Sequence, residues 1–416
     1  MENLSATAGT RFTELFAAPP EVIFRAPGRV NIIGDHTDYL GGFCLPMAIG
    51  PSLYAAAGRN MGVHRLAGAQ GGEKTGGGKP PHSQKINVAS ELFTNRGIEP
   101  VSPESPGSYP IIAAVLAILA ERGFEINGCS LHISGDLPVG AGLSSSAALA
   151  MGTLGALDAM FSLGLSADDK IEIATLAERR AGTPCGWMDP AVIAHARAGQ
   201  ALLLDCYHRE FEEIPLGVLA EMGYAFAVIF SGVRRDLSDG RYASLRARME
   251  SVAAKLKELD ERVSHPRVLG LDAYPAARER LDETDRIYLD HFFLENERVK
   301  TFRSALEHRN PWQAGNLMFD SHGSLCSLGC GTPETDWLVE RLAQDRRCLG
   351  ARVTGAGWGG CVIALLSAAA IRGSESLLAA IWDEGRARFG RKMPWFVAEP
   401  GDGAGMLQIH LQPLKS

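Results

Sequence analysis

The sequence lacks an excess of basic residues, a cysteine framework and a long hydrophobic run. Lysine and arginine number 41 against 48 acidic residues, and the net charge is -7 over 416 residues. Proteins that bind nucleic acid usually carry a basic field, so we expect no nucleic-acid partner. The longest clean apolar run, residues 111–120, is too short to span a bilayer, and we expect no membrane partner either.

The eight cysteines are scattered along the chain. Cys326 and Cys330 lie four residues apart, but no second Cys/His pair with zinc-type spacing accompanies them. We therefore expect eight free thiols in a reducing compartment. Residues 1–20 show no basic patch followed by an apolar stretch, which a secretory signal would have. These features together predict a cytoplasmic protein.

Hydrophobic residues make up 46% of the chain and charged residues 21%, which is typical of a folded globular protein. Apolar segments of strand type and of helix type interleave in both halves, which predicts a mixed α and β class. The glycine-, lysine- and proline-rich residues 68–81 predict a mobile hairpin tip. The main helices are expected over residues 109–122, 146–161, 166–181, 239–263, 283–309, 334–344 and 374–389. The main strands are expected over residues 22–24, 130–134, 201–205, 224–230, 351–354, 361–365 and 395–398.

The strongest chemical signal is a glycine–serine string at residues 138–148, Pro-Val-Gly-Ala-Gly-Leu-Ser-Ser-Ser-Ala-Ala. A strand ends there, glycines allow a tight backbone, and three serines open a helix. The first N–H groups of a helix lack internal partners and carry partial positive charge. Glycines let a phosphate approach those groups closely, and a serine hydroxyl can add a hydrogen bond or a magnesium ligand. A phosphate-binding turn is therefore favoured over a plain capped helix.

A second string, residues 25–42, crowds two arginines, carboxylates and a histidine into a short glycine-rich segment. Carboxylates accept pairs of hydrogen bonds from vicinal hydroxyls, which suits a sugar. The same Asp and His side chains would also suit a metal ion, and a solvated turn needs no ligand at all. The spacing alone leaves these three interpretations open.

Two weaker signals follow. Asp189 stands behind the tight glycine turn of residues 185–188, which makes it a candidate general base, although a turn or capping aspartate is commoner. The string Gly-Ala-Gly-Trp-Gly-Gly-Cys at residues 355–361 is either a bulged turn or a backbone that packs against a ligand.

Taken together and in this order, these strings resemble the GHMP kinases and, within them, the galactokinases. Residues 28–39 resemble the galactokinase signature, residues 138–148 the ATP motif and residues 355–361 the third motif. Residues 231–234, followed by Tyr242, resemble a segment that closes over the sugar. The resemblance covers nearly the whole chain.

The resemblance implies an α+β fold of two domains around a central cleft that holds the active site. The N-terminal GHMP kinase domain would span residues 1–212, with the sugar loop and the ATP motif. The C-terminal domain would span residues 213–416, with a ferredoxin-like fold and the third motif. The implied function is an ATP-dependent sugar-1-kinase that converts galactose to galactose 1-phosphate, and we expect a monomer.

The matching positions also imply roles. Asp189 would lie beside the anomeric hydroxyl, and Arg29 would pair with Asp189 and the transferred phosphoryl group. A neighbouring cation favours the ionised carboxylate, which would accept the hydroxyl proton. The sugar would be held by Asp35, His36, Asp38, Gly186 and Tyr242. The nucleotide would be held by Gly140, Gly142, Ser144, Ser145 and Ser146, and the candidate Mg²⁺ ligands are Ser146 and Glu178.

Several positions depart from the galactokinase pattern. Asp35 stands where galactokinases carry Glu, Pro190 where they usually carry Gln, and Trp187 and Trp358 are bulkier than the usual residues. Kinases for galacturonate, N-acetylgalactosamine or arabinose are therefore the nearest alternatives. A sensor that binds galactose without catalysis is disfavoured, because the ATP motif, Asp189 and Arg29 are all intact.

Overall fold

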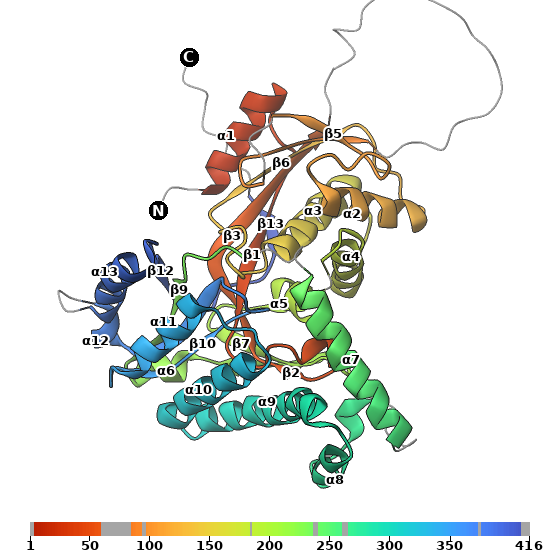
Figure 1. Ribbon diagram of the computed structural model, residues 1–416. Coiled ribbons are helices and arrows are strands. Elements are labelled where there is room, and N and C mark those ends of the chain that lie inside the picture. Colours follow the sequence, from red (N-terminus) through yellow and green to blue (C-terminus); the bar gives the residue numbers. More distant parts are fainter. Residues whose placement is uncertain are drawn as a thin grey trace, which may run out of the picture.

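The computed structural model describes residues 4–59, 85–93, 97–183, 185–235, 240–259, 265–372 and 376–408. The hairpin tip predicted at residues 68–81 lies outside these ranges. The described chain is built on three β-sheets with helices packed against them (Figure 1).

The largest sheet has six strands. Their spatial order is β13 (Gly405–Leu407), β1 (Val22–Asn31), β3 (Pro46–Arg59), β6 (Cys129–Gly135), β4 (Ile86–Ser90) and β5 (Glu99–Val101). All neighbouring strands are antiparallel except β4 and β6. Because β13 pairs with β1, the end of the described chain returns to the sheet in which it began.

Helices cover both faces of this sheet. Helix α3 (Ser145–Phe161) packs on β1 and β3, with α2 (Pro110–Glu121) and α4 (Ala167–Arg180) beside it (Figure 1). Helix α1 (Leu4–Phe16) covers the opposite face, where its Phe12 packs on Ala56. Along β3 the side chains alternate between faces, so Ala55 points toward α3 while Ala56 points toward α1. Helix α3 is apolar all round and almost entirely buried, as expected for a central helix.

The second sheet has the order β10 (Cys348–Val353), β11 (Cys361–Ser367), β9 (Tyr224–Phe230) and β12 (Trp395–Ala398). In chain order this is second, third, first and fourth, all antiparallel, which is the ferredoxin-like arrangement predicted for the C-terminal half. Helices α11 (Pro333–Ala343), α12 (Ala368–Ile371) and α13 (Leu377–Phe389) pack on it.

The third sheet joins β2 (Phe43–Cys44), β7 (Gln200–Asp205) and β8 (Glu210–Pro215). Against it and the second sheet lies a helical layer of α7 (Arg241–Leu259), α8 (Tyr274–Glu279), α9 (Glu283–Glu307) and α10 (Pro311–Ser327) (Figure 1). Shorter elements complete the fold: η1 (Asp38–Leu40), α5 (Met188–His195), α6 (Gly217–Glu221) and η4 (Pro266–Val268). The predicted domain boundary at residues 212 and 213 falls inside β8, and the two-domain division stays a prediction.

Most expected elements exist, and β9 and β12 have the predicted bounds. The capping box of Ser166 and Asp169 at the start of α4 is confirmed. The prediction that β1 ends at residue 24 was wrong, because the strand runs on to Asn31 with a register shift between Pro27 and Arg29. That extension carries Arg29 into the interior.

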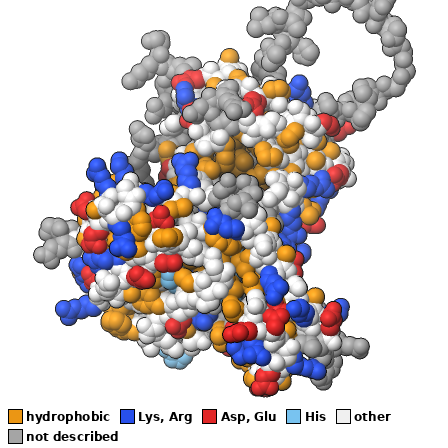
Figure 2. Space-filling view, viewed as in Figure 1, with side chains coloured by type: hydrophobic (Ala, Val, Ile, Leu, Met, Phe, Trp, Pro, Cys, Tyr) orange, Lys and Arg blue, Asp and Glu red, His pale blue; other side chains and the backbone are white. Residues whose placement is uncertain are grey.

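Among the described helices, six had no prediction: α1, α5, α6, α8, α10 and α12. Helix α10 contains glycines and polar residues that hide its periodicity, and α5 is only eight residues long. Among the described residues, no helix combines the length and the apolar character that a membrane crossing needs. All eight cysteines are free thiols, as predicted. Acidic and basic side chains are interspersed over the face shown in Figure 2.

Close packing of α3 on β1 yields a stability prediction. A Cβ at Gly155 would overlap the ring of Phe24, so Gly155→Ala should overpack the interface and lower the free energy of unfolding by about 1–3 kcal/mol. Gly323 on α10 is the matched control, because a Cβ there meets nothing within 4 Å. Gly323→Ala should stabilise by up to about 1 kcal/mol through helix propensity alone. Urea unfolding of both variants measures the difference, and equal effects would contradict the packing argument.

Candidate active site

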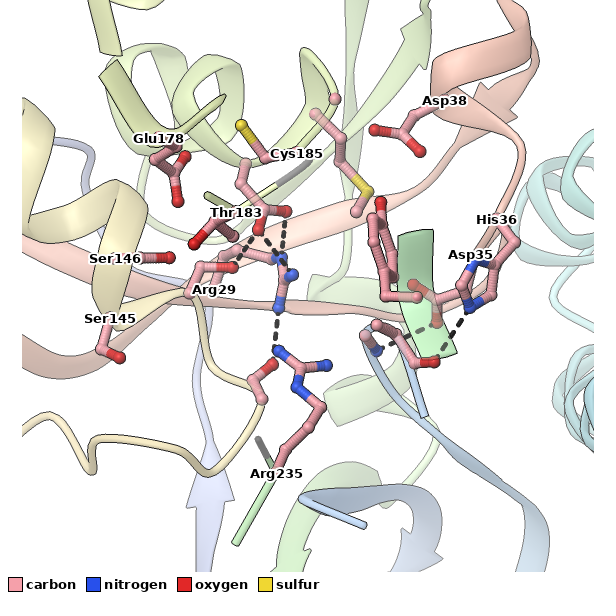
Figure 3. A pocket seen from close by; sticks show the side chains of 18 of the residues that line it. Arg29, Asp35, His36, Asp38, Ser145, Ser146, Glu178, Thr183, Cys185 and Arg235 are labelled. Carbon is pink, nitrogen blue, oxygen red and sulfur yellow. Dashed lines mark hydrogen bonds and ion pairs between the residues drawn. The ribbon is translucent and has the colours of Figure 1, made fainter. Parts of the chain in front are cut away.

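The candidate site is a cavity of about 340 Å³. It lies where the end of β1, the turn before α3, the start of α5 and the loops after β9 and β10 meet. Every residue that the sequence singled out for the site lines this cavity. Figure 3 shows Ser145, Ser146 and Glu178 on one side, Asp35, His36 and Asp38 on the other, and Arg29 and Arg235 between the two groups.

The centre of the cavity is an ion pair between Arg29 and Asp189. Arg29 Nε lies 2.7 Å from Asp189 Oδ1, and Nη2 lies 2.8 Å from Oδ2, which is a bidentate pair. Arg29 is 3% exposed and also donates through Nη1 to the carbonyl of Gly142 at 2.8 Å. Burial opposes its charge, but Asp189 outweighs burial and the pKa of Arg29 is raised. Strand β1 and helix α5, 160 residues apart in the chain, are thereby joined at one point.

Ser144 does not act as a plain helix cap. It adopts a left-handed conformation with φ of 61°, and its side chain makes no capping hydrogen bond to α3. Instead the hydroxyl donates a short hydrogen bond to Asp189 Oδ2. The predicted nucleotide contact of Ser144 stays a prediction, and its observed contact is with the carboxylate at the centre of the site.

The turn before α3 presents backbone to the cavity. Gly140 and Gly142 have φ of 79° and 83°, which residues with a side chain rarely adopt. Ser145 and Ser146 are the first two residues of α3, whose opening N–H groups have no partner within the helix. The amino end of a long buried helix therefore borders the cavity, as the sequence predicted.

Glu178 is a buried carboxylate beside this helix end. It is 1% exposed, and its Oε2 atom has no hydrogen-bond partner among the described residues. Burial raises the pKa of Glu178 to about 7, against a smaller opposing influence from the Ser146 hydroxyl. An orphaned carboxylate oxygen next to a serine hydroxyl is a donor pair that suits a hard divalent cation. The predicted metal ligands thus lie together and fit the ion.

The opposite side of the cavity carries the loop for which the sequence predicts sugar binding. Gly186 lies so close to Asp38 that a Cβ at position 186 would overlap the carboxylate. Burial, followed by the charge of Asp189, raises the pKa of Asp38 to about 6. His36 Nε2 contacts the Ala356 carbonyl at 2.9 Å, and burial lowers the pKa of this histidine to about 4. His36 is therefore neutral at pH 7, and its ring lies beside that of Tyr242.

Asp35 lines the cavity but is already engaged. Its Oδ2 atom pairs with the buried guanidinium of Arg352 at 2.6 Å and accepts from the backbone of Gly355 at 3.2 Å. Its Oδ1 atom accepts from Asn31 Nδ2 at 3.0 Å. The carboxylate thus ties the loop after β10 to the end of β1, which is a positioning role that the sequence did not indicate.

Arg235 is a site residue that the sequence analysis missed. Its guanidinium lies near Gly142 and Gly355, and its Nη1 atom is buried with no partner in the described part of the chain. Its backbone N–H donates to the Gly140 carbonyl at 2.9 Å, which fixes the loop after β9 against the turn before α3. Burial and the charge of Arg29 lower its pKa. The only sequence feature that could have identified Arg235 is that it directly follows residues 231–234, which resemble a segment that closes over the sugar.

Comparisons with known proteins agree with this geometry. Residues 10–59 match the galactokinase galactose-binding signature, residues 110–197 the GHMP kinases N terminal domain and residues 302–383 the GHMP kinases C terminal domain. The fold resembles mevalonate kinase, with a TM-score of 0.60 at 18% identity over 91% of this chain and 99% of that chain. Fold and site therefore define a GHMP kinase.

Curated relatives narrow the family. A galactokinase of Streptomyces coelicolor is 34% identical over 98% of this chain and 99% of its own length. One from Thermococcus kodakarensis is 32% identical over 92% of this chain and 99% of its own length. The crystal structure of Lactococcus lactis galactokinase complexed with galactose has a TM-score of 0.84 at 27% identity and covers 97% of this chain and 100% of that chain. The chain belongs to the galactokinase family, and it is an ATP-dependent phosphotransferase that acts on a sugar hydroxyl.

Proposed function

We propose that the chain transfers the γ-phosphoryl group of ATP to the anomeric hydroxyl of galactose, yielding galactose 1-phosphate and ADP. The observation that carries this proposal is the position of the Arg29–Asp189 pair. It lies between the amino end of α3, which suits phosphates, and the loop of His36 and Asp38, which suits a sugar (Figure 3). A hydroxyl bound on one side would meet a phosphoryl group bound on the other at this pair.

In this proposal Asp189 receives the proton of the attacking hydroxyl. Its carboxylate is held from three donors, two on Arg29 and one on Ser144, so its orientation is fixed before substrate arrives. Its side chain is 18% exposed, to the cavity it lines. Arg29 would counter the negative charge that spreads over the equatorial phosphoryl oxygens.

Ser146 and Glu178 would hold Mg²⁺. The support is the buried Oε2 atom of Glu178, which has no hydrogen-bond partner in the described part of the chain. When bound, magnesium supplies positive charge to the β- and γ-phosphate oxygens.

Arg235 would add a second guanidinium on the phosphate side. Its unpartnered Nη1 atom is buried at the cavity wall near Arg29, where two cations repel one another unless an anion lies between them. A phosphate group would relieve that repulsion. We assign Arg235 to the phosphoryl group being transferred.

A neutral sugar is favoured over galacturonate. The sugar side of the cavity carries the carboxylate of Asp38, while that of Asp35 is paired with Arg352, and His36, the loop's candidate cation, has its pKa lowered to about 4. An anionic sugar would therefore meet like charge there. The assembled Arg29–Asp189 pair argues against a sensor without catalysis. We also propose a cytoplasmic monomer, a location supported by the eight free thiols.

The direct test is ADP release with ATP and a panel of galactose, N-acetylgalactosamine, arabinose and galacturonate. Galactose should give the highest kcat/KM, and galacturonate the lowest. Highest turnover of galacturonate would overturn the proposed substrate while leaving the kinase class intact.

Asp189→Asn should lower kcat by at least about 100-fold, because the amide cannot accept the hydroxyl proton. ATP affinity, measured by calorimetry without sugar, should stay within about threefold, because the variant replaces none of the residues predicted to hold the nucleotide. Near-normal turnover in this variant would rule out Asp189 as the base.

Arg235→Ala should lower kcat by about 100-fold, the usual effect of removing one donor to a transition state. Arg235→Lys, which keeps the charge but not the fork, should recover part of that loss. The KM for galactose should change little in both variants. A rise in galactose KM without a fall in kcat would place Arg235 on the sugar instead.

The Mg²⁺ requirement should depend on pH through Glu178. Its pKa is raised to about 7, so below this pH the carboxyl is protonated and loses its affinity for a cation. The Mg²⁺ concentration for half-maximal activity should rise by about tenfold for each pH unit below 7 and level off above it. Glu178→Gln should need more Mg²⁺ at every pH and lose this slope. An unchanged slope in Glu178→Gln would contradict the assignment.

A further inference from the structure

A second group of metal-ligating side chains lies outside the active site. His322 and Cys326 stand one turn apart on the same face of α10, and Asp336 lies in the first turn of α11. No motif spacing reveals this trio, because its members come from two different helices. Cys330, the residue first considered with Cys326, instead lies toward His36, with Sγ 3.7 Å from His36 Nε2.

The three ligand atoms form a nearly equilateral triangle. His322 Nε2 lies 3.5 Å from Cys326 Sγ and 3.7 Å from Asp336 Oδ1, and Cys326 Sγ lies 3.6 Å from Asp336 Oδ1. In tetrahedral zinc sites the bond lengths place such ligand atoms about 3.4 to 3.6 Å apart. The triangle therefore has the dimensions of one face of a zinc tetrahedron before any ion is bound.

We propose that His322, Cys326 and Asp336 form a binding site for a borderline transition-metal ion, with Zn²⁺ as the best match. The donor set of imidazole, thiolate and carboxylate suits zinc, and it excludes Mg²⁺ and Ca²⁺, which prefer oxygen ligands alone. The Asp336 side chain is 41% exposed, so a water molecule can complete the fourth position. This site is independent of the proposed galactose chemistry.

The charges around the trio favour a cation on balance. Glu340, one turn beyond Asp336 on α11, adds negative charge that acts on both Cys326 and Asp336. Arg352 acts on His322 from the other side, but its guanidinium is paired with Asp35 at 2.6 Å. Burial first, and Arg352 second, lower the pKa of His322 to about 4, so the imidazole is neutral and can donate a lone pair.

Two energetic costs work against tight binding of the metal ion. The Val353 N–H points at His322 Nδ1 over a long 3.5 Å, and a metal on Nε2 would move the ring proton to Nδ1 and break this contact. The thiol proton of Cys326 must also pass to solvent as the thiolate forms. With three protein ligands and these two costs, binding should be reversible and weaker than in a closed four-ligand site.

Gly331 allows the third ligand to reach the trio. A Cβ at this position would overlap the Asp336 carboxylate, so Gly331→Ala should push that flexible side chain away. This variant disturbs the triangle while leaving all three ligand residues in the chain. It separates a preformed site from a chance group of polar side chains.

The test is titration of the metal-free full chain with Zn²⁺, in competition with a chromophoric zinc indicator and under excess Mg²⁺ to occupy the active site. We expect one zinc per chain in the native protein and at least about tenfold weaker binding in Cys326→Ser and Asp336→Asn. Cys206→Ser is the matched control, because Cys206 and Cys326 are the two cysteines that are half-buried and the others are buried. The zinc affinity of the Cys206→Ser variant should not change. Co²⁺ should give a thiolate charge-transfer band that Cys326→Ser removes.

Gly331→Ala should bind zinc at least about tenfold more weakly than the native chain. Near-UV circular dichroism checks that each variant is folded. If Cys326→Ser does not fold, Asp336→Asn tests the site in its place. Equal zinc affinity in Cys326→Ser and Cys206→Ser would overturn the proposal. Unchanged zinc affinity in both Gly331→Ala and Asp336→Asn would show that Asp336 is not a ligand. That result would overturn the three-ligand site.

Discussion

The bidentate pair of Arg29 and Asp189 is the interaction on which the rest of the site depends. It joins the end of β1 to the start of α5 in a region where Arg29 is almost fully buried. Burying a charge is tolerable only when it is paired and hydrogen-bonded, so the geometry of this pair is tightly constrained. Ser144 and the Gly142 carbonyl complete its hydrogen bonds, and they come from the turn that also presents the end of α3.

The charges on the two sides of the cavity differ. On the proposed phosphate side lie the amino end of α3, Arg235 and the orphaned oxygen of Glu178, an arrangement that suits a polyanion with its divalent cation. On the sugar side lie a carboxylate at Asp38 and a neutral imidazole at His36. Neutral hydroxyls can pair with both groups. The proposed catalytic pair lies where these two environments meet (Figure 3).

Packing fixes Asp35, one of the four residues that depart from the resemblance to galactokinases. Its carboxylate is held by Arg352, Gly355 and Asn31. Arg352 links it further to the carbonyls of Asn31 and Ile32. The loop after β10 is therefore anchored to β1 through a buried ion pair, and the same guanidinium neighbours the proposed zinc site at His322.

Local chemistry in the sequence was enough to predict much of this protein. The apolar periods located most helices and strands, the Ser166–Asp169 pair located a helix start, and the glycine–serine string located the amino end of α3. These features depend on residues a few positions apart, where propensity and capping operate directly. The family motifs likewise identified residues that all line one cavity.

What the sequence did not contain was the long-range pairing. Three features depend on contacts between distant segments. Asp35 pairs with Arg352, and Ser144 donates to Asp189 instead of capping its own helix. Arg235 lines the cavity. The trio of His322, Cys326 and Asp336 was not predicted for the same reason. Helices α10 and α11 both pack on β10, and only this arrangement brings the Asp336 carboxylate to the Cys326 thiol. Where distant segments are in contact, the direction of each side chain follows from how whole helices and strands pack together. No local sequence rule predicts these directions.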